Sequence, residues 1–380
     1  MIYVHIPFCR SFCTYCGFYS EVAGPGKDAE RFESYVDALV AEAAERRDEI
    51  SATLDTDTLY IGGGTPSVLP LSLLQRIVSA LPYGPFGEFT IEVNPEDIVS
   101  KGIDDARGLR ELGVTRVSMG IQSFDDCTLR WMNRRHDSSR AHEAFGILRE
   151  AGFDNISIDL IFGVPSSAAG RDGESLESCL ERWRSTIREA VEMHPQHISA
   201  YQLSIEEGSA LERMMSDGRC SEASEEECRL QYDILCEELS QAGYVHYEIS
   251  NFAKPGFEAR HNSAYWSRVP YVGLGAGAHS FDGRRRLWNG ELEAHGTCIP
   301  ARTAYQRSSE DLSPEDAVVE RIMLALRTAK GAEASWLRSV CGPGRVERLV
   351  SEGALVETGT MIRIPESRFF VSDDIIRELL

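Results

Sequence analysis

The chain has 380 residues, which is enough for one large and one smaller domain, and its hydrophobic content of 42% is ordinary for a globular protein. The formal charge of −21 at pH 7 argues against nucleic acid as a partner, because phosphate groups would be repelled. No apolar run approaches the roughly 18 residues that span a membrane, and Met1 leads into a predicted strand without the regions of a signal peptide. We therefore expect a cytoplasmic protein with reduced cysteines.

Short apolar segments alternate with amphipathic helical patterns about six times in the first 203 residues. This alternation is typical of parallel β/α units whose strands are covered on both faces and are continuously apolar. Six units are too few for a closed eightfold barrel, so the sequence predicts an α/β fold with an open, partial (β/α)6 barrel. The predicted strands are 2–7, 58–61, 88–93, 116–121, 155–162 and 197–203, and the predicted helices are 28–50 (with Asp28 as N-cap), 71–81, 103–112, 125–133, 138–151 and 176–193.

The remaining chain changes in composition near Pro300. We predict a first domain over 1–300 and a small C-terminal α+β domain over 301–380 that resembles a winged helix. The elements expected after the partial barrel are a helix from the acidic run 221–227 to about 241, a strand over 244–252, a Gly- and aromatic-rich region over 253–289, a polar helix or linker over 301–312, a helix over 314–328, a short helix near Trp336, strands at 354–357 and 361–365, and a last helix over 373–380.

Three cysteines form a C-x3-C-x2-C array, Cys9, Cys13 and Cys16, directly after the first predicted strand. Three thiolates on one loop can hold three corners of a [4Fe–4S] cluster and leave one iron open for an outside ligand. A redox dithiol and a structural zinc site are the alternatives. The third cysteine argues against a simple dithiol, and a zinc site would need His5 as its fourth ligand unless strand alternation points that ring elsewhere.

The array is preceded by His-Ile-Pro-Phe at 5–8 and followed by Phe18. It resembles the radical S-adenosylmethionine (SAM) superfamily and, more narrowly, its oxygen-independent coproporphyrinogen III oxidase-like branch. The resemblance implies that the open iron chelates the amino and carboxylate groups of SAM. It also implies that the cluster, once reduced by an electron donor, cleaves SAM to a 5′-deoxyadenosyl radical. It supports the partial barrel, in which ligands gather at the carboxyl ends of the strands.

A glycine-rich turn, Gly62–Thr65, follows the second predicted strand. Glycines let backbone N–H groups approach an anionic ligand closely, although any tight βα turn can carry them. Behind the cysteine array, Gly63, Gly64 and Thr65 resemble the superfamily's loop that binds the methionyl group of SAM.

Two carboxylates, Glu92 and Asp159, lie inside predicted strands, where a charge is costly unless it is paired. A structural ion pair would explain them, but the resemblance assigns both to the SAM pocket, where they would meet amino or ribose groups. Arg134 would pair with the SAM carboxylate, and Tyr15 would contribute backbone near the adenine. The other residues that the resemblance assigns to this pocket are Tyr3 and Gln122.

A second motif, H-N-x-x-Y-W, runs from His261 to Trp266. A histidine beside two aromatic residues suits a haem pocket and equally suits ordinary core packing. The motif resembles the haem-binding motif of the HemW-type haem chaperones, a subgroup of the same branch, and implies a haem-binding segment near 244–281 with His261 binding haem. His279 is then either a second ligand or a packed loop residue. The triplet Arg284–Arg286 is either a solvated turn or a contact for propionates or a membrane surface.

One feature separates the subgroups of this branch. The coproporphyrinogen III dehydrogenases carry a fourth cysteine two residues past the array, where this chain has Phe18, and they have a longer extension before it. Gly17 departs from the chaperones, which usually have Asp there. The resemblance, strong from about Tyr3 to Phe281, implies a haem chaperone that delivers haem to acceptor proteins such as respiratory enzymes. The alternatives are a dehydrogenase that decarboxylates coproporphyrinogen propionates oxidatively to vinyl groups, and a zinc-stabilised binding domain.

Overall fold

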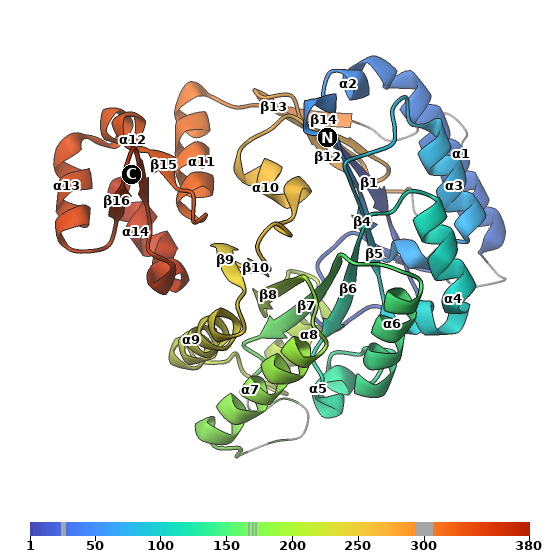
Figure 1. Ribbon diagram of the computed structural model, residues 1–380, viewed down its shortest axis with the longest axis horizontal. Coiled ribbons are helices and arrows are strands. Elements are labelled where there is room, and N and C mark those ends of the chain that lie inside the picture. Colours follow the sequence, from blue (N-terminus) through green and yellow to red (C-terminus); the bar gives the residue numbers. More distant parts are fainter. Residues whose placement is uncertain (24–27, 166–167, 169–170, 172, 293–306) are drawn as a thin grey trace.

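The structure is a computed structural model that describes residues 1–23, 28–165, 168, 171, 173–292 and 307–380. Six parallel strands form the arc of an open barrel (Figure 1), and this confirms the predicted partial (β/α)6 barrel. Three short strands extend the arc at its edges, where β11 pairs parallel with β1, and β10 and β9 continue antiparallel beyond β8. In sheet order the strands are β11 (Val272–Leu274), β1 (Ile2–Ile6), β4 (Thr58–Gly63), β5 (Glu88–Val93), β6 (Arg116–Gln122), β7 (Ile156–Phe162), β8 (His197–Gln202), β10 (Asn251–Ala253) and β9 (Val245–Glu248).

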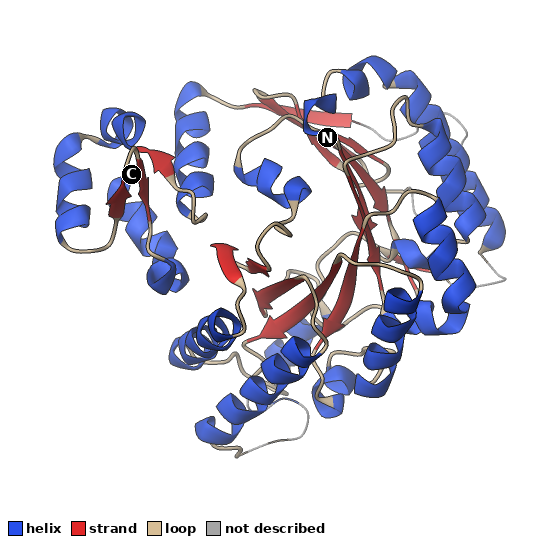
Figure 2. Ribbon diagram, in the orientation of Figure 1, coloured by secondary structure: helices blue, strands red, loops and turns tan. Residues whose placement is uncertain are grey.

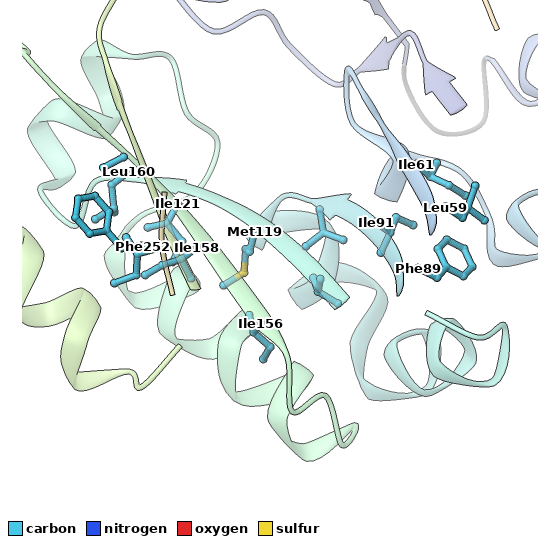
Figure 3. Close-up of a cluster of buried hydrophobic side chains, with 14 of the residues drawn as sticks. Leu59, Ile61, Phe89, Ile91, Met119, Ile121, Ile156, Ile158, Leu160 and Phe252 are labelled. Carbon is cyan, nitrogen blue, oxygen red and sulfur yellow. The ribbon is translucent and has the colours of Figure 1, made fainter. Parts of the chain in front are cut away.

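Helices cover the outer side of the arc (Figure 2). The side chains that meet them are large and aliphatic or aromatic, and they come from alternate positions of each strand, as Figure 3 shows for Leu59 and Ile61 of β4 and for Phe89 and Ile91 of β5. All four are at most 1% exposed, so this layer is the main core of the barrel. The helices that follow these strands are α1 (Ala29–Glu45), α3 (Leu71–Ala80), α4 (Pro95–Glu111), α5 (Asp126–Trp131), α6 (Ser138–Glu150), α7 (Leu176–Glu192), α8 (Ala210–Ser216) and α9 (Glu225–Gln241).

The opposite face of the same strands is polar. Tyr60 bonds Glu92 from strand to strand, and Ser118 bonds Asp159 in the same way. The prediction of continuously apolar strands is therefore wrong for one face. Since consecutive side chains of a strand point to opposite faces, the apolar residues meet the helices and the polar residues line the inside of the barrel.

Two predicted helices differ in their bounds. The helix predicted over 28–50 is divided at Arg46 into α1 and α2 (Arg47–Ser51), because Arg46 leaves helical geometry and its buried guanidinium reaches the Gly273 carbonyl. Asp28 stands at the N-cap position of α1, but its side chain makes no cap hydrogen bond. The helix predicted from 103 begins earlier, at Pro95, and bends at Gly102 (φ 77°).

The strand predicted over 244–252 is wrong as a single element. It is the antiparallel pair β9–β10, which reverses direction at 249–250. The helix α10 (Arg260–Trp266) follows and lies on the concave side of the arc (Figure 1). Neither α10 nor α8 was among the predicted elements.

A second sheet follows the barrel and contains β12 (His279–Phe281), β13 (Arg285–Asn289) and β14 (Arg307–Asp311), all antiparallel. The polar helix or linker predicted over 301–312 is wrong for 307–311, which pairs with β13, and residues 301–306 lie outside the described residues. The predicted domain boundary at 300/301 also lies outside them, so that division stays a prediction.

The C-terminal part is a small α+β unit with a three-stranded antiparallel sheet in the order β15-β17-β16. The two predicted strands are present, and β15 and α13 were not expected. No helix in the described part of the chain is both long and apolar enough to cross a membrane. The elements of this unit are α11 (Pro314–Leu326), β15 (Ala332–Glu333), α12 (Ala334–Cys341), α13 (Pro343–Ser351), β16 (Val356–Thr358), β17 (Met361–Arg363) and α14 (Ser372–Leu379).

Candidate functional site

The cysteine loop leaves the carboxyl end of β1. Its two ends are fastened together by the short parallel strands β2 (Phe8–Cys9) and β3 (Glu21–Val22), where Ala23 N–H donates to the Cys9 carbonyl at 2.8 Å. Backbone hydrogen bonds hold its middle, since Thr14 N–H donates to the Met132 carbonyl at 3.1 Å. The loop is thus fixed over the ends of the barrel strands.

The three thiols of the array are partly exposed on this one loop. Burial raises the pKa of Cys9, and it raises the pKa of Cys16 to about 11. Both thiols therefore hold their protons at neutral pH until a metal displaces them, which is the usual coupling between metal binding and proton release. Three sulfur donors on one loop fit the ligand set of a [4Fe–4S] cluster with one open iron.

The groups next to the thiols come from two other segments at the carboxyl side of the barrel. Thr65 Oγ1, just after β4, lies 3.4 Å from Cys9 Sγ. Arg134 Nη1 lies 3.4 Å from Cys13 Sγ. Arg134 also donates from Nη2 to the Gly120 carbonyl at 2.6 Å, whereas its buried Nε has no hydrogen-bond partner among the described residues. A half-buried guanidinium with an unpartnered Nε suits an anionic ligand beside the thiols.

Asn94 joins these groups and was not predicted. It donates from Nδ2 to Thr65 Oγ1 at 3.1 Å and accepts from Arg134 Nη2 at 2.7 Å. Its position directly after β5 could have indicated a site residue, because polar residues at the carboxyl ends of barrel strands meet at one site. The predicted residues Thr65 and Arg134 are thus brought together with Cys9 and Cys13 as expected.

The glycine turn approaches the cysteine loop closely. A Cβ atom at Gly64 would lie 2.8 Å from the Phe8 carbonyl oxygen and 3.0 Å from Cys9 Sγ. Gly63 has φ 114°, and a Cβ there would lie 2.6 Å from the His5 ring. Only glycine fits at either position.

The His5 ring points into the barrel rather than toward the thiols. Its Nδ1 lies 2.9 Å from Tyr3 Oη, and its Nε2 lies 2.9 Å from the Tyr19 carbonyl oxygen. Both nitrogens are therefore engaged away from the array, so in this arrangement His5 does not serve as the fourth ligand that a zinc site would need. Tyr3 thereby lies inside the barrel, beside the His5 ring.

Two carboxylates lie deeper in the barrel. Glu92 accepts from Tyr60 Oη at 2.7 Å and from Gly63 N–H at 3.0 Å, and burial, helped by Asp159, raises its pKa to about 7. Asp159 accepts from Ser118 Oγ at 3.3 Å, and burial raises its pKa as well. Neither carboxylate forms an ion pair within the described ranges, so the structural ion pair considered for them is not seen there.

The two remaining pocket residues also lie at the carboxyl edge. Tyr15 packs with Met132, Ile161 and Val164 in a small apolar cluster at the carboxyl end of β7. Gln122 has φ 71°, where a bulge interrupts the pairing of β6 with β7. All predicted SAM-pocket residues therefore face the barrel interior or its carboxyl edge.

The H-N-x-x-Y-W motif forms α10 and lies at the other end of the barrel. The backbone N–H groups of Arg260 and His261 donate to the Glu88 carboxylate at 2.9 and 2.8 Å. His261 Nδ1 lies 2.9 Å from Thr58 Oγ1, at the first residue of β4, whereas Gly63 ends that strand. Five residue steps of about 3.3 Å place these ends roughly 16 Å apart, so the structure does not bring His261 to the cysteine loop.

His261 itself is 1% exposed. Its second nitrogen, Nε2, lies 3.1 Å from Tyr265 Oη, so both nitrogens have partners, and burial lowers the pKa of the ring to about 3. The imidazole is therefore neutral and enclosed. Its partners Glu88 and Thr58 were not identified from the sequence. Each is a polar residue at the first position of a strand whose other residues are mostly apolar, and that position could have indicated them.

Comparison with known proteins places these residues in a wider context. A model of the Radical SAM superfamily matches residues 3–168. The heme chaperone HemW of Bacillus subtilis (strain 168) is 32% identical over 335 residues, which cover 87% of this chain and 83% of that protein. The heme chaperone HemW of Mycobacterium tuberculosis (strain ATCC 25618 / H37Rv) is 30% identical, with coverage of 100% and 94%.

Among solved structures, coproporphyrinogen III oxidase (HemN) from Escherichia coli, described as a radical SAM enzyme, superimposes with a TM-score of 0.79. The superposition covers 100% of this chain and 89% of that chain at 21% sequence identity. At this identity the likeness shows a shared fold.

Proposed function

Because the chain belongs to the radical SAM superfamily and, within it, to the HemW family of haem chaperones, we propose that it binds haem and delivers it to acceptor proteins. Its cofactors are one [4Fe–4S] cluster, held by Cys9, Cys13 and Cys16, and SAM. The acceptors are haem-requiring proteins such as respiratory enzymes, and an electron donor serves the cluster. The protein works in the cytoplasm, where the thiols stay reduced, with peripheral membrane contact at most.

One observation carries the proposal. The likeness to the haem chaperones extends over the whole chain, and it includes the three-cysteine loop at the carboxyl end of β1 and the motif helix α10 at the amino end of β4. The two sites share one barrel and occupy opposite ends of it, which leaves room for a radical cofactor and a haem on the same protein.

The residues at the carboxyl end have defined roles in the proposal. Arg134 binds the SAM carboxylate through the guanidinium that already contacts Cys13, and the backbone at Gly63 and Gly64 admits the methionyl chain. Glu92 receives the amino or ribose groups, beside the N–H of Gly63 that it already accepts. When bound, the cluster would supply the electron that SAM cleavage requires.

Haem binding by His261 requires a local rearrangement. Its Nε2 must leave the Tyr265 hydroxyl, or its Nδ1 must leave Thr58, before a ring nitrogen can reach iron. Each bond is a single neutral hydrogen bond, with a net contribution of about 1 kcal/mol, and the Tyr265 ring that packs against His261 must move as well.

The test is a haem titration of anaerobically reconstituted protein, followed by transfer to an apo-form of a b-type haem enzyme. Wild-type protein should develop a Soret band and restore the acceptor's activity. His261→Ala should weaken haem binding and keep the iron and sulfide of the cluster. His142→Ala is the matched control, because His142 is exposed on α6 and pairs with Glu189.

A second arm addresses the dehydrogenase. The protein is incubated with coproporphyrinogen III, SAM and a reductant, and the products are separated for protoporphyrinogen. Formation of protoporphyrinogen, or failure of wild-type protein to bind haem, would contradict the chaperone assignment.

A further inference from the structure

A cavity of about 220 Å³ is lined by residues of α10, the β12–β13 hairpin, α11 and the segment after α10. Three aromatic rings line it: Tyr265 at the end of the motif, Tyr271 and Phe281. The rings of Tyr265 and Tyr271 meet edge to face, with centroids 4.8 Å apart. Such walls suit a flat, aromatic ligand.

The same cavity carries a cluster of two arginines and one glutamate. Arg268 Nη2 lies 2.9 Å from Glu320 Oε2, and Arg286 pairs with the other oxygen of that carboxylate. Arg268 also lies over the Phe281 ring, 5.2 Å from its centroid, and its Nε and Nη2 make no geometrically sound hydrogen bond among the described residues. Two guanidinium groups thus share one carboxylate, in a chain whose formal charge is −21.

Two further charged groups lie near this cluster. Glu310 is the cross-strand neighbour of Arg286 on β14, but it is exposed and forms no ion pair with Arg286 within the described chain. Arg321 follows Glu320 on α11, and its guanidinium stacks on the Trp336 ring at 3.9 Å. Neither group neutralises the second of the two guanidinium groups that share Glu320. The cavity therefore carries a net positive charge, which favours an anionic group such as a carboxylate.

His279 supplies a donor for a metal at the same wall. It stands two residues before Phe281 on β12, so both side chains share one face, and its ring stacks on Trp288 of β13 with centroids 6.1 Å apart. His279 is exposed, in contrast to its predicted alternative as a packed loop residue, and its nitrogens bond no other group among the described residues. An imidazole with a free nitrogen is a common axial ligand of haem iron.

The cavity and the motif share one residue. The Tyr265 hydroxyl is hydrogen-bonded to His261 Nε2, and the Tyr265 ring lines the cavity. His261 lies behind that ring, at 1% exposure. The part of the motif that faces the cavity is therefore its tyrosine and not its histidine.

We propose that this cavity is the docking site for haem, with His279 binding the iron and with Arg268 and Arg286 binding a propionate carboxylate. The proposal rests on the function proposed above and locates where haem first contacts the protein. One macrocycle can span these groups, because the Phe281–Arg286 pair lies two residue steps, about 7 Å, from His279 along the hairpin.

The volume of the cavity suits a protein that carries haem without enclosing it. Pockets that enclose a drug-sized ligand measure about 300–1,000 Å³, so 220 Å³ holds one edge of a porphyrin and leaves the rest in solvent. A partly exposed haem can be passed to an acceptor without first being released. Two residues of the Arg284–Arg286 triplet have different surroundings. Arg286 lines the cavity, whereas Arg285 pairs with Asp282 on the surface.

The experiment titrates ferric haem and haem dimethyl ester, whose carboxylates are blocked, into full-length reconstituted protein. Haem should bind about tenfold more tightly than the ester, the ratio expected for one charged hydrogen bond. His279→Ala should remove the imidazole-ligated absorption spectrum of the docked haem iron, whereas His261→Ala should keep that spectrum at reduced affinity. Arg286→Gln should abolish the preference for haem over the ester, and Arg285→Gln is its matched control.

The outcomes separate the two proposals. If wild-type protein binds neither form, the chaperone function itself is contradicted. If wild-type protein binds haem and its ester equally and His279→Ala keeps the spectrum, the chaperone function stands and the docking site is wrong. The comparison of haem with its ester needs no variant, so it decides the carboxylate contact even if Arg286→Gln fails to fold.

Discussion

Replacing Glu92 by glutamine should stabilise the protein at pH 8 and leave its stability at pH 5 nearly unchanged. Burial raises the pKa of Glu92 from its ordinary 4.5 to about 7. Between these values the folded protein holds a proton that the unfolded chain has released, so the free energy of unfolding falls as the pH rises. Glutamine has no proton to lose, so the variant is spared this fall.

The size of the effect follows from the two pKa values. Their difference corresponds to about 3 kcal/mol in the free energy of unfolding once the carboxyl is fully ionised, at about 1.4 kcal/mol per pH unit. This is an upper bound, because part of the Glu92 side chain is solvent-accessible inside the barrel. The amide oxygen of glutamine can still accept the hydrogen bond from Tyr60. The amide nitrogen cannot accept from the Gly63 N–H, and the loss of that hydrogen bond reduces the expected gain in the free energy of unfolding.

The assay is urea denaturation of the apo-protein, wild type and Glu92→Gln, at pH values from 5 to 8. The difference between the two proteins is the quantity to follow, because Glu248, whose pKa burial also raises to about 7, titrates equally in both. Glu111→Gln, at an exposed position of α4, is the control for the loss of one carboxylate charge. A gap between Glu92→Gln and wild type that is the same at pH 5 and pH 8 would refute the reasoning.

Three further outcomes are expected. Gly64→Ala should lower the iron and sulfide bound after reconstitution while the far-UV circular dichroism stays unchanged, because its Cβ would lie 3.0 Å from Cys9 Sγ; full cluster content would contradict the close approach. Cys13→Ala should lose iron and sulfide without unfolding the barrel, and retention of both would remove Cys13 from the ligand set. Glu88→Ala should lower the free energy of unfolding by about 2–4 kcal/mol, since it leaves two N–H groups of α10 without their charged acceptor. It should also weaken haem binding. Urea denaturation and haem titration measure the two effects, and an unchanged urea midpoint would show that Glu88 does not hold the motif helix.

Much of the barrel could be predicted because the signals are local. The strands and helices follow from apolar periodicity within each segment, and the array of Cys9, Cys13 and Cys16 needs only eight consecutive residues to define a ligand set. The predictions that were wrong concern interruptions of a local pattern by distant partners. Arg46 ends α1 because its guanidinium reaches the Gly273 carbonyl across the fold, and no window around residue 46 contains that acceptor.

The sequence by itself determined the partial barrel, the cysteine loop and the family, because these depend on spacing within short segments. Only the tertiary structure decided that His261 is enclosed at the amino end of β4, that Asn94 joins Thr65 to Arg134, and that Arg286 meets Glu320 beside His279. The physical reason is that such contacts join residues far apart in the chain. Strand register and helix packing set those distances, and both are properties of the folded chain as a whole.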